Sequence, residues 1–203
     1  MVDAILTFFA YAVLAIGAEN VIFTRALGIS SGLRVIDNPN KDTFYFCVSL
    51  TVFQLINSLL AYAVVPAVAK TPLGEYTRFL GPIIVVICCA VSYMIVIAAL
   101  SVSVKKSFLK RIIVSLTGAS INSAIVGTII FSIGQNYNLA QTIGFAIGSS
   151  IGYFLAMLII AEGEKKIHED AVPAPFKGLP VTLIYIGIIA LAIYGLTGHT
   201  TAL

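Results

Sequence analysis

The sequence predicts an all-α integral membrane protein with six transmembrane helices. Fifty-nine per cent of its 203 residues are hydrophobic and 10% are charged, which gives a mean hydropathy of +1.03; an average soluble domain carries about 25% charged residues. Apolar runs of about 20 residues, the length that crosses a bilayer, recur six times. Each run must be helical, because lipid offers the backbone no hydrogen-bond partners.

The six predicted spans form a single membrane domain, 1–203. In chain order they are Ala4 to about Gly28, Thr43–Ala69, Phe79–Val104, Ile112–Gly134, Leu139–Ala161 and Leu179–Gly198. The N-terminus has no basic region in front of its apolar run, so we expect a retained first span and not a cleaved signal peptide.

The connections between spans differ sharply in charge. The first, third and fifth connections share one side of the membrane and hold nine Lys or Arg residues, whereas the other side holds two. Cytoplasmic connections carry the excess of positive charge. The pattern therefore predicts cytoplasmic odd-numbered connections and both termini outside. The basic residues lie at the ends of spans and form no single face, so nucleic-acid binding is not predicted.

The first span contains an unusual polar segment, Gly17–Ser30. Glu19 and Arg25 lie within it, and Glu19 is expected near mid-depth. Ionisable groups inside a membrane are expensive and usually functional, although Arg25 alone could extend to the interface. On a straight helix the two side chains would point about 240° apart. Either the helix breaks here, or each group meets a partner from another segment.

The two halves of the chain resemble each other weakly at a period near 100 residues. Gly17–Asn20 in the first span matches Gly118–Asn122 in the fourth, and Gly81-Pro82 matches Leu179-Pro180. A duplicated unit of three spans must enter the membrane in opposite directions. We therefore predict two inverted repeats, about 1–104 and 105–203, with helices 1 and 4 interrupted at a central site.

Few other motifs carry chemistry. The sequence has no phosphate-binding loop, catalytic triad or zinc-type cluster, so no catalytic residue and no metal ligand is predicted. Cys47, Cys88 and Cys89 are interpreted as small buried hydrophobic residues. The Gly and Ser residues of the fifth span are interpreted as a helix-packing face.

The sequence resembles the six-span membrane subunits of the Rnf and Nqr electron-transport complexes, and most closely the Rnf A / Nqr E type. Three stretches carry the resemblance: Asn20 to Leu27-Gly28, Asn122 with Ala124–Gly127, and Val172–Gly178. It implies a location in a bacterial or archaeal cytoplasmic membrane, a paralogous six-span partner of opposite orientation, further subunits that carry flavins, and a [2Fe-2S] cluster shared with the partner.

The sequence departs from the family at the cluster ligands. Serine stands at both positions where the family has cysteine, Ser30 and Ser123, and such clusters are normally held by thiolates. We therefore expect no cofactor bound by this chain itself. Glu19, Asn20, Arg25 and Asn122 are the predicted ion or proton path, with Glu19 as the responsive carboxylate, Asn20 and Asn122 as coordinating amides at the breaks, and Arg25 as a counter-charge.

Three functions remain open at this point. The first is a membrane subunit of an Rnf/Nqr-like ion-translocating oxidoreductase, coupling electron transport to Na⁺ or H⁺ movement and not catalytic by itself. The second is a stand-alone inverted-repeat transporter of ions or small solutes. The third is a structural subunit that packs against a paralogue.

Overall fold

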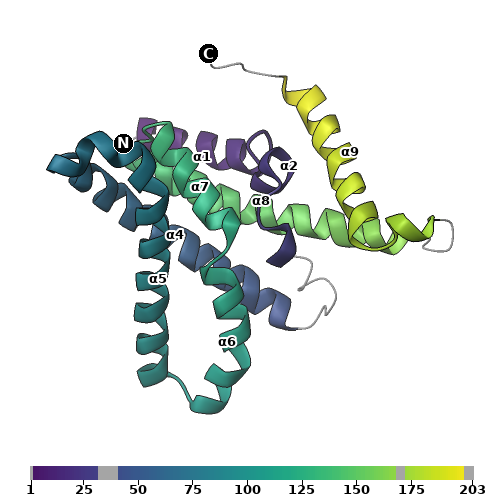
Figure 1. Cartoon of the computed structure of the whole chain (residues 1–203), viewed down its shortest axis with the longest axis horizontal. Coiled ribbons are helices and arrows are strands. Elements are labelled where there is room, and N and C mark those ends of the chain that lie inside the picture. Colours follow the sequence, from purple (N-terminus) through teal and green to yellow (C-terminus); the bar gives the residue numbers. More distant parts are fainter. Residues whose placement is uncertain (1, 32–40, 168–171, 199–203) are drawn as a thin grey trace.

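The fold is entirely helical over the residues that the structure describes. A computed structural model of the chain describes residues 2–31, 41–167 and 172–198 (Figure 1). Five of its helices are long and apolar enough to cross a membrane, and a sixth apolar helix, at the N-terminus, is shorter. The predicted all-α membrane fold is therefore confirmed, while the arrangement as six spans in two inverted repeats stays a prediction.

The first and fourth predicted spans are both interrupted. The first consists of α1 (Val2–Ile16) and the short α2 (Val21–Arg25), and the fourth consists of α6 (Lys106–Ser120) and α7 (Ser123–Gly134). Each second piece begins directly after an asparagine, Asn20 or Asn122, whose side chain accepts a backbone hydrogen bond. Asparagine is among the preferred residues at this position, because its oxygen satisfies N–H groups that have no partner within the helix.

The other spans are continuous helices. They are α4 (Lys41–Ala69), α5 (Thr77–Ser103), α8 (Leu139–Lys166) and α9 (Leu179–Thr197), with short 3₁₀ turns η1 (Pro72–Tyr76) and η3 (Ala174–Phe176). The start of α8 is fixed by a reciprocal cap. Asn138 Oδ1 accepts from Gln141 N at 2.9 Å, and Gln141 Oε1 accepts from Asn138 N at 2.7 Å.

Helices α1 and α8 form the closest packed pair of the fold. Gly144, Gly148 and Gly152 of α8 lie against the backbone of Phe8, Ala12 and Ala15, in that order, and a methyl group on any of the three glycines would collide with the facing carbonyl oxygen. The order shows that the two helices run parallel. The predicted use of these glycines for packing is confirmed, and it brings the end of α1 to the middle of α8.

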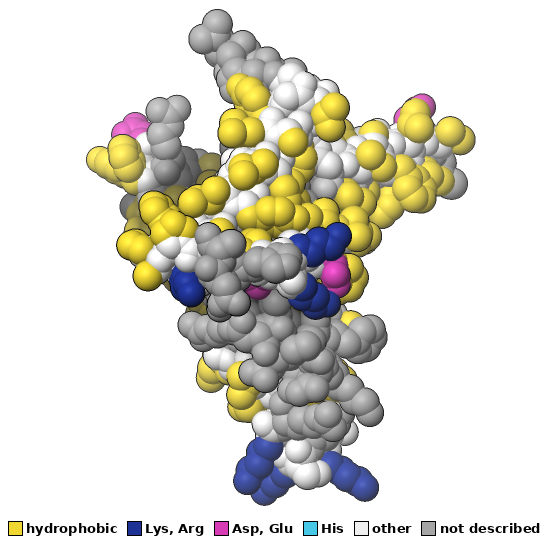
Figure 2. Space-filling model, turned by 90° about the vertical axis from the view of Figure 1, so that its right-hand side faces the viewer, with side chains coloured by type: hydrophobic (Ala, Val, Ile, Leu, Met, Phe, Trp, Pro, Cys, Tyr) yellow, Lys and Arg dark blue, Asp and Glu magenta, His cyan; other side chains and the backbone are white. Residues whose placement is uncertain are grey.

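The remaining helices surround this pair (Figure 1). Helix α4 packs against α5, α6, α7 and α8, and it contributes Phe46, Leu50 and Phe53 to the buried core. Helices α5 and α6 project together from one side, and α9 rises at the far end of α8. Figure 2 shows Lys and Arg side chains at the tip where α5 joins α6, and hydrophobic side chains over much of the upper surface.

Candidate functional site

The candidate site is built around the break in the first span. Helix α1 closes with hydrogen bonds from Gly17 N to Val13 O (3.1 Å) and from Glu19 N to Leu14 O (2.9 Å). Asn20 is then extended and starts α2, which ends at Ala26 in the left-handed region, with φ of 53°. The chain thus turns twice within this short segment, at the place where the sequence predicts an interruption of the first helix.

Asn20 holds this break together. Its amide nitrogen donates to Ile16 O at 3.0 Å and to Gly152 O at 2.9 Å. Its oxygen accepts from Ile22 N at 3.1 Å and from Phe23 N at 3.4 Å. The buried side chain therefore joins the end of α1, the start of α2 and the middle of α8, and both amide hydrogens and the oxygen are used inside the chain.

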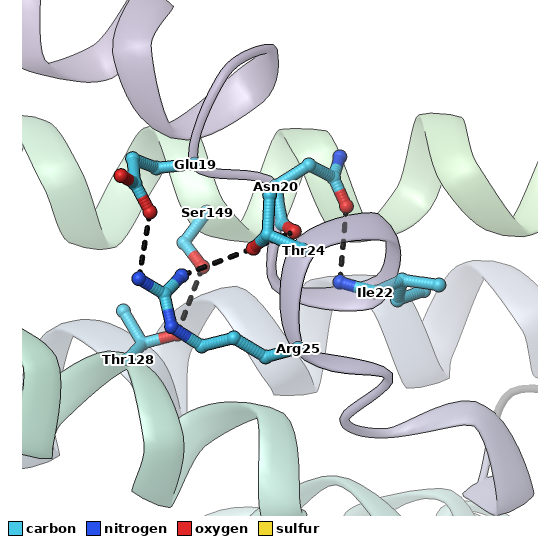
Figure 3. Close-up of polar contacts among 7 residues, drawn as sticks. All are labelled: Glu19, Asn20, Ile22, Thr24, Arg25, Thr128 and Ser149. Atoms are coloured by element: carbon cyan, nitrogen blue, oxygen red, sulfur yellow. Dashed lines mark hydrogen bonds and ion pairs between the residues drawn. The ribbon is translucent and has the colours of Figure 1, made fainter. Parts of the chain in front are cut away.

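Glu19 and Arg25 form an ion pair across the break (Figure 3). Arg25 Nη2 lies 2.6 Å from Glu19 Oε2, and the side chains of Arg25 and Glu19 are 26% and 30% exposed, respectively. The guanidinium also lies over the ring of Phe131 in α7, with its carbon 4.0 Å from the ring centroid, a favourable cation–π arrangement. Of the two alternatives predicted for these residues, the helix break is the one observed.

The ion pair lies nearer to the end of the fourth span than to its middle. Phe131 is in the last turn of α7, about 12 Å along the helix from Ser123. Tyr137, in the uncharged turn that follows, contacts the Phe131 and Tyr11 rings, and burial raises its pKa to about 12. Neutral aromatic rings therefore stand beside the pair. Asn20, the residue after Glu19, bonds to Gly152 in the middle of α8, so the mid-depth position of Glu19 stays a prediction.

A groove of about 470 Å³ opens on the other side of Glu19. It is lined from the first break by Ala18, Glu19, Phe23 and Thr24, and from α9 by Gly187, Ala190, Leu191, Ile193, Tyr194 and Thr197 together with Gly198. Most of these side chains are apolar. Glu19 is the only carboxylate among these lining residues, which also include Thr24, Tyr194 and Thr197, so the groove presents one acidic group among mostly apolar side chains.

The two breaks meet at Gly28. Its N–H donates to Ser123 Oγ at 2.9 Å, and its carbonyl accepts from Tyr153 Oη at 2.7 Å. Gly28 has φ of +81°, and a Cβ there would come within 3.0 Å of Tyr153, Ala124 and Asn122. Only glycine therefore fits this position. We call Gly28, Asn122, Ser123 and Tyr153 the junction.

Asn122 caps α7 within the junction. Its oxygen accepts from Ala124 N at 2.9 Å, while its buried Nδ2 has no hydrogen-bond partner among the residues that the structure describes. The sequence-predicted residues thus fall into two groups: Glu19 and Arg25 form a charged pair beside α7, and Asn20 and Asn122 cap the helix breaks.

The two positions where the family has cysteine differ in their surroundings. Ser30 is exposed and Ser123 Oγ already accepts the Gly28 N–H, and neither hydroxyl replaces the thiolates that such a cluster needs. Within the described ranges, no three His, Cys, Asp or Glu side chains lie close enough to hold a metal ion.

Sequence reasoning missed several residues of the site. Tyr153 and Phe131 look like ordinary aromatic residues in apolar spans. Thr128 and Ser149, whose hydroxyls are 2.9 Å apart, form a buried polar contact beside the ion pair (Figure 3). In the sequence they appear only as small hydroxyl residues in two spans, and such residues are equally common where two membrane helices simply pack together.

Sequence comparisons relate this chain to known membrane subunits. The family model described as Rnf-Nqr subunit, membrane protein, matches residues 8–200. An A-type subunit of an ion-translocating oxidoreductase complex from Vibrio cholerae is 29% identical over 95% of this chain and 90% of its own length. An E-type subunit of a Na⁺-translocating NADH-quinone reductase from a Psychrobacter species is 29% identical over 72% and 68%, respectively.

A third relative is the A-type subunit of a Na⁺-translocating ferredoxin:NAD⁺ oxidoreductase complex from Acetobacterium woodii. It is 26% identical over 91% of this chain and 93% of its own length. The resemblance noted in the sequence thus extends along nearly the whole chain, including both helix breaks. This membrane protein belongs to the Rnf-Nqr subunit family.

Proposed function

We propose that this chain is a membrane subunit of an ion-translocating oxidoreductase, in which its first helix break forms part of the path for Na⁺ or H⁺. The observation that carries the proposal is the Glu19–Arg25 pair. It is half-buried, it sits where a transmembrane helix is interrupted, and Glu19 also lines an open groove. Interrupted helices are a common basis for ion sites in membrane proteins.

The pair is suited to bind and release a cation. A cation or proton that enters the groove competes with Arg25 for the Glu19 carboxylate. When it binds, Arg25 keeps its second contact over Phe131, at 4.0 Å, so the released guanidinium is not left without a partner. Asn20 and Asn122 remain proposed ion-path residues, acting through the break geometry that they fix.

Exposed residues at the breaks support a protein partner. Ala26 and Ser123 are exposed, and Ile121, beside the Asn122 cap, is 59% exposed. Irregular backbone at membrane depth is tolerated where protein or water covers it, but not against lipid. We propose that a paralogous six-span subunit of opposite orientation covers this face, with the flavin-bearing subunits of the complex beyond it.

We further propose that this chain supplies no ligand to an iron–sulfur cluster, since serine occupies positions 30 and 123. The proposed location is a bacterial or archaeal cytoplasmic membrane with both termini outside. The parallel course of α1 and α8 supports this topology, because it places the start of α1 on the same side as the uncharged turn before α8.

The test is ion uptake by proteoliposomes that contain the intact complex. Glu19→Gln should abolish redox-driven Na⁺ or H⁺ uptake while the complex still assembles. Because this change removes the carboxylate that balances the charge of Arg25, the double variant Glu19→Gln/Arg25→Gln provides a neutral, hydrogen-bonding pair at the same place. Unchanged uptake in an assembled variant would remove Glu19 from the mechanism.

A matched control is available in α8. Glu162 pairs with Lys165 at 2.7 Å, but both side chains are well exposed, so Glu162→Gln should leave uptake unchanged. The same liposomes prepared with this chain alone separate the other functions. Ion uptake by this chain without redox partners would favour a stand-alone transporter. Normal uptake by complexes that carry the Glu19→Gln/Arg25→Gln double variant would favour a structural role for this chain.

A further inference from the structure

A second polar site lies in the middle of α4, away from the residues discussed so far. Gln54, Asn57 and Ser58 are 2%, 0% and 3% exposed, respectively. Their spacing of three and four residues places them on one face of the helix. Asn57 is the central residue of the apolar stretch Tyr45–Ala69, so the site is about 18 Å from either end of the span.

The hydrogen bonding of this group is incomplete. Gln54 Nε2 makes a long contact of 3.4 Å to Ser58 Oγ. Neither Nδ2 nor Oδ1 of Asn57 has a partner among the described residues, although both atoms are fully buried. A buried polar atom left without a partner destabilises a protein by about 1–3 kcal/mol, and the surrounding lipid offers no replacement.

The chemistry of the two free atoms identifies their partner. Oδ1 needs a donor and Nδ2 needs an acceptor. A bare cation would satisfy the oxygen and be repelled by the amide hydrogens, whereas a water molecule serves as both donor and acceptor. Buried water typically makes about three hydrogen bonds to such groups. We propose that Gln54, Asn57 and Ser58 form an internal water site at the centre of the membrane domain.

This inference does not depend on the proposed function. The water site is built on α4 alone, and it uses none of the groups at the first break or the junction. The proposal predicts a bound water molecule at the buried face of α4, the helix that packs against α5, α6, α7 and α8. This prediction holds whether or not Glu19 takes part in ion movement.

The experiment is hydroxyl-radical labelling of the purified membrane complex in ¹⁸O-water by X-ray pulses. Radicals formed from internal water oxidise the nearest side chains, and Phe53 is one turn of α4 from Asn57 yet 0% exposed. We expect ¹⁸O label on Phe53 at several times the level on Phe145, which is also fully buried. No excess label on Phe53 of the unmodified protein would overturn the proposal.

Two variants test whether the ¹⁸O label on Phe53 comes from water bound at Asn57. Asn57→Leu, of similar volume, should reduce the Phe53 label at least about fivefold. Thr128→Val, which disrupts a buried polar contact that is already satisfied, should leave it unchanged. Full label in Asn57→Leu would contradict the assignment. So would an unlabelled Phe53 together with stoichiometric ²²Na⁺ retention that Asn57→Leu abolishes, because the occupant would then be a cation.

Discussion

The breaks in the first and fourth spans use the same device with different results. In each, an asparagine in an extended conformation caps the helix that follows. Around Asn20 the break is long and charged, and every hydrogen-bonding position of the amide is filled. Around Asn122 the break is shorter and uncharged, and the amide nitrogen has no partner among the described residues.

The comparison separates what interrupts a membrane helix from what acts at the interruption. Asparagine capping is common to both breaks, so it explains the interruption itself. The ion pair, its contact with the Phe131 ring and the groove all belong to the first break. The chemistry that distinguishes the first break is therefore carried by Glu19 and Arg25, and the fourth break contributes the junction that holds Gly28.

The largest effect is expected where the two breaks touch. Gly28→Ala should destabilise the protein by ~3 kcal/mol, because alanine is strained at φ of +81° and its Cβ collides with Tyr153 and Ala124. The measurement is thermal unfolding of detergent-purified protein. Gly81→Ala in α5, where a Cβ meets nothing within 4 Å, is the control. Equal stability of the two variants would show that the breaks do not meet at Gly28.

The second comparison is between the two caps, where the smaller quantity is the difference between two variants, about 2 kcal/mol. Asn20→Ala removes bonds to Ile16, Gly152 and α2 and should destabilise the fold by about 3 kcal/mol. Asn122→Ala removes one accepted bond and an unpaired donor and should destabilise it by about 1 kcal/mol. Chemical unfolding of both variants under the same conditions measures the difference. If Asn122→Ala were the more destabilising change, the two caps would have been ranked wrongly.

The smallest effect concerns the two serines at the family's cysteine positions. Ser123→Ala leaves the Gly28 N–H without its acceptor and should lower the free energy of unfolding by about 1 kcal/mol. Ser30→Ala, at an exposed position, should change it by less than about 0.5 kcal/mol. Chemical unfolding compares the two serine variants. An effect of Ser30→Ala as large as that of Ser123→Ala would indicate a role for Ser30 that its exposure does not suggest.

The sequence was informative where polarity interrupts an apolar run. The matching stretches Gly17–Asn20 and Gly118–Asn122 marked both breaks, and in the structure Asn20 and Asn122 cap the helices that follow. The pairing of Glu19 with Arg25 did not follow from the sequence, since it depends on two turns that change the positions expected on a straight helix.

Other parts of the site gave no distinctive signal. Tyr153 and Phe131 are aromatic residues in apolar segments, and only the tertiary fold brings Tyr153 to the Gly28 carbonyl and Phe131 to the Arg25 guanidinium. Asn57 lies in a span whose other polar residues resemble ordinary helix contacts. Its importance arises from the absence of a partner among the described residues, which no sequence pattern indicates.

The most direct test of the proposal that this chain supplies no ligand to an iron–sulfur cluster is an iron and acid-labile sulfide determination, with an EPR spectrum, on this chain purified with the proposed six-span partner alone. Because the Ser123 hydroxyl accepts the Gly28 N–H and is not a thiolate, we expect no iron or sulfide above background and no EPR signal of a cluster. Two iron atoms and two sulfides per pair, with an EPR signal on reduction, would contradict it and mean that a serine or one of the cysteines ligates iron.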